Sequence, residues 1–174
     1  TRQSIKKHVA SLTIGSAGVA WLLTHESLAP RAPKILGGVT RTDSTAVHLC
    51  QGSGTLEDLV METDSEALMI AGVKLARETW LAFLAEMNFK ARDIHKIIPH
   101  QVGTTHRRAF MEALEIASKP DFSTFTTYGN TGSAALPLTF MKAAEAGLFQ
   151  AHDCIAFTGI GSGLTSTMLA LEWP

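Results

Sequence analysis

The pattern of apolar and polar positions predicts three helices. Behind a capping box at Thr63-Asp64-Ser65-Glu66, apolar residues recur at helical spacing and predict a long, largely buried helix over about 64–88. A second apolar stripe predicts a helix over roughly 103–116. A third helix begins near Ser133, tolerates Pro137 within its opening turn and ends at Gly147.

Short apolar runs predict five strands, over residues 39–49, 94–98, 122–127, 153–158 and 164–172. The sequence Gln51-Gly52-Ser53-Gly54 indicates a flexible turn. Strands that alternate with helices favour an α/β fold, in which helices cover a mixed, mostly parallel five-stranded sheet. The last two strands are expected to pair antiparallel across a glycine-rich turn.

Two segments near opposite ends of the chain share one pattern. Residues 12–23 and 156–169 each contain an apolar run, a turn led by Ile-Gly-Ser and a second apolar run. Glycine permits such a turn, and flanking runs of this length indicate paired strands, the first pair lying over about 8–24. The repeat indicates an internal duplication.

The duplication suggests how the chain divides. Pro30 and Pro33 mark a linker between a remnant of the first repeat and a complete second repeat. We therefore expect 1–30 to be the terminal strand pair of one half and 31–174 to be the other half. On this interpretation the sequence is the back half of a larger protein.

Composition excludes several classes of protein. The 174 residues include 15 Lys and Arg against 16 Asp and Glu, and no basic stripe suggests nucleic-acid binding. No apolar run approaches the ~20 residues that a membrane-spanning helix needs. Two distant cysteines form no disulfide framework, which favours a reducing, cytoplasmic location. These features are typical of an intracellular enzyme domain.

Three predicted loops follow the carboxyl ends of strands, where α/β sheets bind ligands. They span residues 99–103, 128–132 and 158–163 and offer an imidazole, a carboxamide and a glycine-rich backbone. His100 and Asn130 are suitable donors to an oxygen that gains negative charge, and the helix after Asn130 adds partial positive charge. The residues themselves therefore predict a polar site for an oxyanion.

The same loops resemble those of a known family. Pro99-His100-Gln101, Gly129-Asn130-Thr131 and the turn over 161–165 (Gly-Ser-Gly-Leu-Thr) are similar to motifs in the C-terminal half of ketoacyl synthase III, a condensing enzyme of the thiolase superfamily. The order and spacing match over essentially the whole chain. His-Gln-Val-Gly and Gly-Ile-Gly-Ser-Gly-Leu are more similar to a subgroup that joins two acyl-CoA chains head to head in olefin biosynthesis.

The resemblance implies half of a thiolase-like αβαβα sandwich and a Claisen-condensing acyltransferase. His100 and Asn130 would be two members of a Cys-His-Asn triad whose cysteine lies in a missing N-terminal half. The substrates would be thioesters of coenzyme A or acyl-carrier protein, without a permanently bound cofactor or metal, and the enzyme would be a homodimer. Residues expected to contact the substrate are Gln101, Val102, Gly103, Gly52, Ile160, Gly161, Ser162 and Gly163.

Plainer interpretations of these residues stay open. His100 and Asn130 are also explained as a hydrogen-bonded core histidine and a turn residue, and the glycines as a means of close strand packing. His95, His100 and His106 lack a cysteine or carboxylate at metal-ligand spacing. His48 and Cys50 would share a strand face as a thiol–imidazole pair. The alternative function is a non-catalytic thiolase-like subunit that binds acyl-CoA or supports an active partner.

Overall fold

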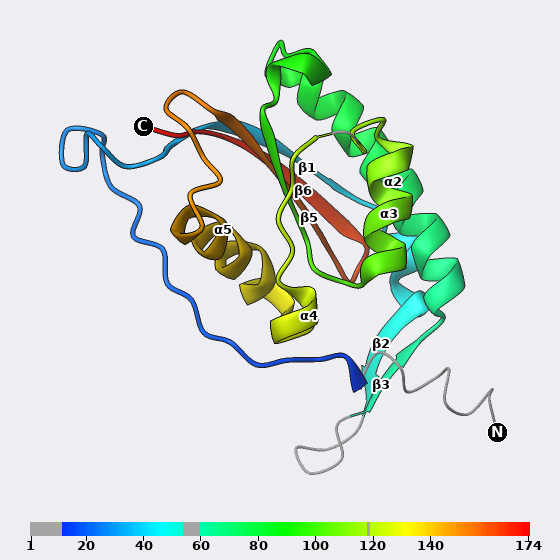
Figure 1. Ribbon diagram of the computed structural model, residues 1–174. Helices are drawn as coiled ribbons and strands as arrows, with labels where there is room; N and C mark the ends of the chain where they lie inside the picture. Colours follow the sequence, from blue (N-terminus) through cyan, green and yellow to red (C-terminus); the bar gives the residue numbers. More distant parts are fainter. Residues whose placement is uncertain (1–11, 54–59, 118) are drawn as a thin grey trace.

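The computed structural model describes residues 12–53, 60–117 and 119–174 of the chain. A four-stranded sheet with the order β1-β6-β5-β4 lies between helices on its two faces (Figure 1). β4 and β5 are parallel, whereas β6 runs antiparallel to both of its neighbours, as predicted for the last two strands; the described sheet is therefore mixed, but mostly antiparallel where a mostly parallel one was expected. The strands are β1 (Lys34–Thr42), β4 (Lys96–Pro99), β5 (Cys154–Gly161) and β6 (Thr165–Glu172).

Helices α2 (Ser65–Glu86) and α3 (Thr104–Ala113) cover one face of the sheet, and α5 (Ala135–Glu145) covers the other. Consecutive strand residues point to opposite faces. Ala156 of β5 packs in the cluster with Trp80 and Phe83 of α2, while Phe157 packs with Ala143 of α5. The three predicted helices and the α/β class are therefore confirmed.

The ends of the helices follow from local capping chemistry. The N-cap of α2 is Asp64, whose side chain accepts a hydrogen bond from the backbone N–H of Ala67 at 3.1 Å. The predicted capping box, with Thr63 as the cap, is therefore displaced by one residue. Pro137 is the third residue of α5, and Gly147 follows that helix with a φ of +70°, as a C-terminal glycine should.

Two predicted strands are wrong in whole or in part. The run over 39–49 contributes to β1 only as far as Thr42, because Asp43 accepts from the backbone N–H of Thr45 and opens the 3-10 helix η1 (Ser44–Leu49). The run over 122–127 forms no strand; instead α4 occupies Phe125–Tyr128. A single parallel bridge joins Asp121 to Ile97, so the described sheet has four strands where five were expected.

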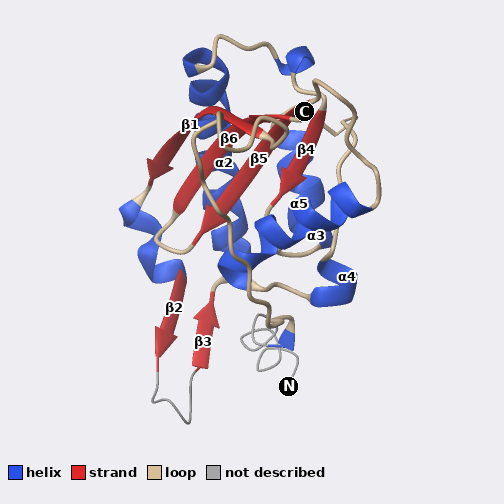
Figure 2. Cartoon of the chain, turned by 90° about the vertical axis from the view of Figure 1, so that its left-hand side faces the viewer, coloured by secondary structure: helices blue, strands red, loops and turns tan. Residues whose placement is uncertain are grey.

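A separate hairpin consists of β2 (Cys50–Ser53) and β3 (Val60–Thr63), and it projects beyond the main sheet (Figure 2). The predicted flexible turn at 51–54 is therefore largely strand, and Gly54 lies outside the described residues. Two short 3-10 helices complete the described structure, η2 (Ala91–Asp93) and η3 (Gly132–Ala134).

The N-terminal segment does not form the predicted strand pair in its described part. Residues 8–11 lie outside the described structure, and after a single bridge between Ile14 and Asn130 the chain runs without regular structure along α5 (Figure 1). The ring of Trp21 packs on Phe140 and Phe157, with centroid distances of 5.9 and 5.6 Å. A strand needs a neighbouring edge for its hydrogen bonds, and the described chain offers none along this segment. The division near residue 30 stays a prediction.

The position of the α2 cap can be tested. Asp64→Ala removes the acceptor for the Ala67 N–H and should lower the free energy of unfolding by about 1 kcal/mol. Thr63→Ala keeps that bond and is the matched control. Urea unfolding, followed by circular dichroism, measures the free energy of unfolding of both variants. A larger loss for Thr63→Ala than for Asp64→Ala would show that Thr63 is the N-cap.

Candidate functional site

His100 lies at the carboxyl edge of the sheet, directly after β4. The register places Pro99 opposite Thr158 of β5, and the backbone N–H of His100 donates to the Thr158 carbonyl at 3.0 Å. β4 is buried along most of its length, so the imidazole leaves the strand from a rigid position. The parallel pairing therefore fixes where His100 sits relative to β5.

The electrostatics of His100 favour a neutral ring. Burial lowers the pKa of His100 to about 4 from its ordinary value of 6.5, because the charged form loses solvation. Arg107 lines the same cavity, but its guanidinium forms a bidentate ion pair with Asp121. The cavity beside His100, which Val102 and Gly103 also line, holds about 20 Å³. That is room for about one water, so the described residues alone form no substrate-sized cavity beside His100.

Gln101 is 2% exposed and joins the end of β4 to the segment that leads to Asn130. Its Nε2 donates to the carbonyl of Pro99 at 2.8 Å. Its Oε1 accepts from the Ser123 hydroxyl and from the backbone N–H groups of Thr124 and Phe125, at 2.9, 3.1 and 3.2 Å. These bonds explain why the predicted strand over 122–127 fails, since two of its backbone donors are already used.

Asn130 is held by backbone and side-chain hydrogen bonds. Its N–H donates to the Thr13 carbonyl at 2.8 Å, and its carbonyl accepts from the Gly15 N–H at 2.9 Å. Its Oδ1 accepts from the backbone N–H of Gly132 at 3.0 Å. This Asx turn leaves Nδ2 as the side chain's free donor, because no described residue accepts from it. The carboxamide therefore presents an N–H group near the start of α5.

The glycine-rich segment after β5 differs from the prediction in one respect. Gly159 and Gly161 belong to β5, and the turn proper begins at Ser162. Gly163 has a φ of +120°, which L-residues with side chains rarely adopt, and a Cβ on Gly161 would meet no atom within 4 Å. Among the described residues, nothing therefore covers the Gly161 backbone on that side.

The turn lies against the β2–β3 hairpin and α2. The Ser162 hydroxyl donates to the Cys50 sulfur at 3.3 Å, so this side chain points toward β2. Ile160 packs against Gly72 of α2, while Gly52 of β2 is exposed. Gln101 therefore joins the His100 loop to residues 123–125, which lead to the Asn130 loop, whereas the turn contacts the β2–β3 hairpin and α2.

Cys154 is not in a state suited to nucleophilic attack. Burial, followed by three nearby carboxylates, raises the pKa of the Cys154 thiol to about 11, so it stays protonated. The prediction that His48 and Cys50 share a strand face is wrong. His48 is exposed on the 3-10 helix η1, which ends at Leu49 before Cys50. Within the described ranges, no three histidine, cysteine or carboxylate side chains are grouped to hold a metal ion, and no helix could cross a membrane.

The sequence did not indicate two of these features. The ion pair between Arg107 and Asp121 joins residues with no recognisable spacing, and Gln101 was predicted to contact substrate. A polar residue that follows a buried strand, such as Gln101, can either contact a substrate or form hydrogen bonds within the chain. Only the position of the 123–125 backbone shows that Gln101 bonds within the chain.

The neutral state of His100 predicts a pH dependence of stability. Between about pH 6.5 and about pH 4 the unfolded chain binds a proton at this position and the folded chain does not, so stability falls as pH falls. From about pH 7 to about pH 5 we expect wild type to lose roughly 2 kcal/mol more than His100→Gln. Urea unfolding measures the difference, with His48→Gln as the exposed control. Parallel losses in wild type and His100→Gln would show that His100 titrates normally.

The bonds of Gln101 predict a large effect on stability. Gln101→Met keeps the approximate size of the side chain but removes the acceptor for three donors, of which the buried Thr124 N–H costs ~1–3 kcal/mol when left without a partner. We expect a loss of about 1–3 kcal/mol in the free energy of unfolding, with faster amide hydrogen exchange at Thr124 and Phe125. Gln150→Met, at an exposed position, is the control. Unchanged exchange at both amides would contradict this role.

The chain is similar to proteins of known family. The family model for the C terminal of 3-oxoacyl-(acyl-carrier-protein) synthase III matches residues 84–173. An acyl-CoA:acyl-CoA alkyltransferase of Shewanella oneidensis is 36% identical over 182 aligned residues, which cover 99% of this chain and 52% of that protein. A protein of the same name from Xanthomonas campestris is 33% identical over 173 residues, with 99% and 50% covered.

Solved structures show the same fold. Xanthomonas campestris OleA, solved with lauric acid and lauroyl-CoA, superposes with a TM-score of 0.86 at 31% identity, covering 99% of this chain and 50% of that one. The thiolase-like α/β class is therefore confirmed. The chain spans about half the length of the curated relatives it matches. By the match over residues 84–173, the chain belongs to the 3-oxoacyl-(acyl-carrier-protein) synthase III C-terminal family.

Proposed function

We propose that the complete protein containing this chain is an acyltransferase that forms a carbon–carbon bond by Claisen condensation of acyl thioesters. The observation that carries the proposal is the neutral imidazole of His100, held at the sheet edge and joined through Gln101 to the segment that leads to Asn130. The names of the relatives, two of them acyl-CoA:acyl-CoA alkyltransferases, support this reaction class.

His100 and Asn130 would act as hydrogen-bond donors to the thioester oxygen. That oxygen gains negative charge as the α-carbon becomes nucleophilic, so preorganised N–H groups stabilise the transition state more than the ground state. A neutral imidazole suits this role, because it carries one N–H donor without a charged group to desolvate. The Asx turn of Asn130 presents Nδ2, and the start of α5 adds partial positive charge nearby.

The nucleophile would come from residues that precede this chain in the complete protein. Cys154 is a protonated strand residue, and Cys50 accepts a hydrogen bond from Ser162. The relatives are about twice as long, and Leu22, at 89% exposure, is part of an uncovered apolar segment that would pack on an additional half. The resemblance also implies a cytoplasmic homodimer, and this stays a prediction.

The substrate contacts of this chain would be made mainly by backbone. Gly161 borders open space, and Gly163 and Gly103 present main chain without a bulky side chain. Ile160 and Val102 would supply apolar surface, and Gly52 and Ser162 lie at the hairpin corner. We assign Gln101 a positioning role, because its amide bonds within the chain. Acyl-CoA is the preferred thioester, with acyl-carrier protein as the alternative.

The complete protein tests this function. Incubation with lauroyl-CoA, followed by intact-mass measurement and product analysis, should show a covalent acyl group and a condensed product. His100→Ala and Asn130→Ala should each lower condensation about 10²–10³-fold, the effect typical of losing one oxyanion donor, while covalent acylation persists. His106→Ala, on the neighbouring helix, is the matched control.

Two outcomes would contradict the proposal. Wild-type condensation in both alanine variants would remove His100 and Asn130 from the mechanism. Tight binding of lauroyl-CoA without any covalent acyl group or product would instead indicate the non-catalytic subunit.

A further inference from the structure

A pair of buried threonine hydroxyls joins the start of α4 to α5. The Oγ1 atoms of Thr124 and Thr139 are 2.6 Å apart. Thr124 is 5% exposed and Thr139 is fully buried. A hydroxyl that is removed from water needs a hydrogen-bond partner inside the protein. Each of these side chains therefore serves as a partner for the other.

The direction of this hydrogen bond follows from the number of protons available. A threonine hydroxyl has one proton to donate and two lone pairs that accept. The Thr139 hydroxyl donates to the carbonyl of Ala135, one turn earlier in α5, at 2.7 Å. The proton between the two threonines is therefore that of Thr124, and Thr139 accepts it. Two hydrogen bonds in series thus connect Thr124 to the first residue of α5.

The backbone of Thr124 is held by other parts of the candidate site. Its N–H donates to Oε1 of Gln101 at 3.1 Å. Its carbonyl accepts from the backbone N–H groups of Thr127 and Tyr128 in α4, at 3.1 and 2.9 Å. Thr124 therefore connects three segments, which are the loop after His100, the helix α4 and, through its side chain, α5.

Asn130 lies in the short loop that this side-chain bond closes. α4 ends at Tyr128 and α5 begins at Ala135, so Asn130 lies between them. Thr124 is the N-cap of α4, and Thr139 lies within α5. A bond between the two helices restricts the residues between them, because it removes conformational freedom that the loop would otherwise have.

The packing of α5 does not by itself explain a hydroxyl at this position. Ala135, Thr139 and Ala143 are four residues apart and form one buried stripe of the helix. Alanine at position 139 would complete an apolar stripe, would favour the helix and would leave no hydroxyl to satisfy. The bond to Thr124 therefore explains the threonine better than burial does.

We propose that Thr124 and Thr139 are positioning residues for the condensation step, an inference that rests on the proposed function. Their hydrogen bond holds the Asn130 loop in place relative to His100, so that both donors reach the same thioester oxygen. Both hydroxyls are buried, so they act through the loop and not on the substrate. Preorganised donors lose their effect when one of them moves, and a displacement of about 1 Å can lower a rate ~10²-fold.

Kinetic measurements on the complete protein with lauroyl-CoA test this role. Thr124→Val removes the bond between the threonines, while Thr139 keeps its acceptor in Ala135, so no buried donor is left unsatisfied. We expect condensation to slow at least about tenfold, with covalent acylation unchanged. Thr124→Ser keeps a hydroxyl and should restore most of the rate. Wild-type condensation in Thr124→Val, or no rescue by Thr124→Ser, would overturn the proposal.

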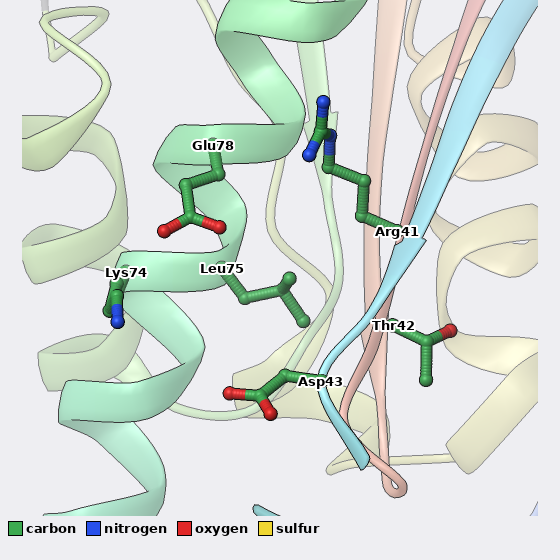
Figure 3. A pocket seen from close by; sticks show the side chains of 6 residues that line it. All are labelled: Arg41, Thr42, Asp43, Lys74, Leu75 and Glu78. Atoms are coloured by element: carbon green, nitrogen blue, oxygen red, sulfur yellow. The ribbon is translucent and has the colours of Figure 1, made fainter. Parts of the chain in front are cut away.

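Thr79→Val is a matched control for Thr139→Val. Thr79 is fully buried in α2, and its hydroxyl donates to the carbonyl of Leu75, one turn earlier, at 2.8 Å. α2 covers the opposite face of the sheet from α5, and Leu75 points from α2 toward the end of β1 (Figure 3). Thr139→Val should slow condensation as Thr124→Val does, whereas Thr79→Val should not. An equal loss in both would show that damage to a helix, and not the position of Asn130, slows the reaction.

A double-mutant cycle tests whether the bond acts through Asn130. Once Asn130→Ala has removed the carboxamide, no group remains for the threonines to position. Adding Thr124→Val to that variant should therefore slow condensation no further. A second loss as large as that of Thr124→Val alone would overturn the proposal.

A measurement without turnover separates this inference from the proposed function. In the complete protein with isotope-labelled asparagine, the carboxamide signal of Asn130 is the one that Asn130→Ala removes. This signal should shift in Thr124→Val and Thr139→Val and stay in place in Thr79→Val. An unmoved signal would overturn the positioning role. Shifted signals in a wild-type protein that condenses nothing would support the bond to the Asn130 loop and contradict the proposed function alone.

Discussion

The buried amide of Gln101 is the contact on which the arrangement of the candidate site depends. It couples the end of a rigid strand to the segment that leads to Asn130, and it accepts from three donors, of which the Thr124 N–H is buried and would otherwise lack an acceptor. The same bonds divert residues 123–125 from the sheet, so the described sheet stops at β4. One side chain thus holds the end of β4 against residues 123–125 and limits the extent of the sheet.

Burial of His100 has a consequence for chemistry as well as for stability. A ring with a pKa of about 4 is neutral across the physiological range, so it can donate one hydrogen bond to an oxyanion without itself exchanging a proton. The guanidinium of Arg107, which lines the cavity beside His100, forms its ion pair with Asp121. Both features favour a site that stabilises negative charge through oriented dipoles.

The described residues form only a small part of a substrate-sized cavity beside His100. The cavity beside His100 holds about 20 Å³, whereas ligand pockets of drug-sized molecules are typically ~300–1,000 Å³. The N-terminal segment exposes Leu22, Leu23 and Leu28, which a further layer of protein would cover. The relatives are about twice as long as this chain, and under the proposed function their additional half would cover this apolar surface and complete the cavity.

The sequence by itself determined the features that depend on local periodicity. The three helices, the antiparallel pair formed by β5 and β6 and the buried strand before His100 follow from apolar spacing and from turn-forming glycines, and the structure contains all of them. The motifs around His100, Asn130 and Gly161 pointed to the family because each is a short run of residue types that is visible without the tertiary structure.

Only the tertiary structure decided features that depend on distant partners. The threonine-rich run over 122–127 has strand propensity, yet Gln101 captures its donors. Residues 12–23 match a strand-pair pattern, but in the described part Ile14 makes a single bridge and no adjacent strand edge continues it. Hydrogen-bond partners far apart in the chain leave no periodic pattern, and propensity gives way wherever such a partner is present.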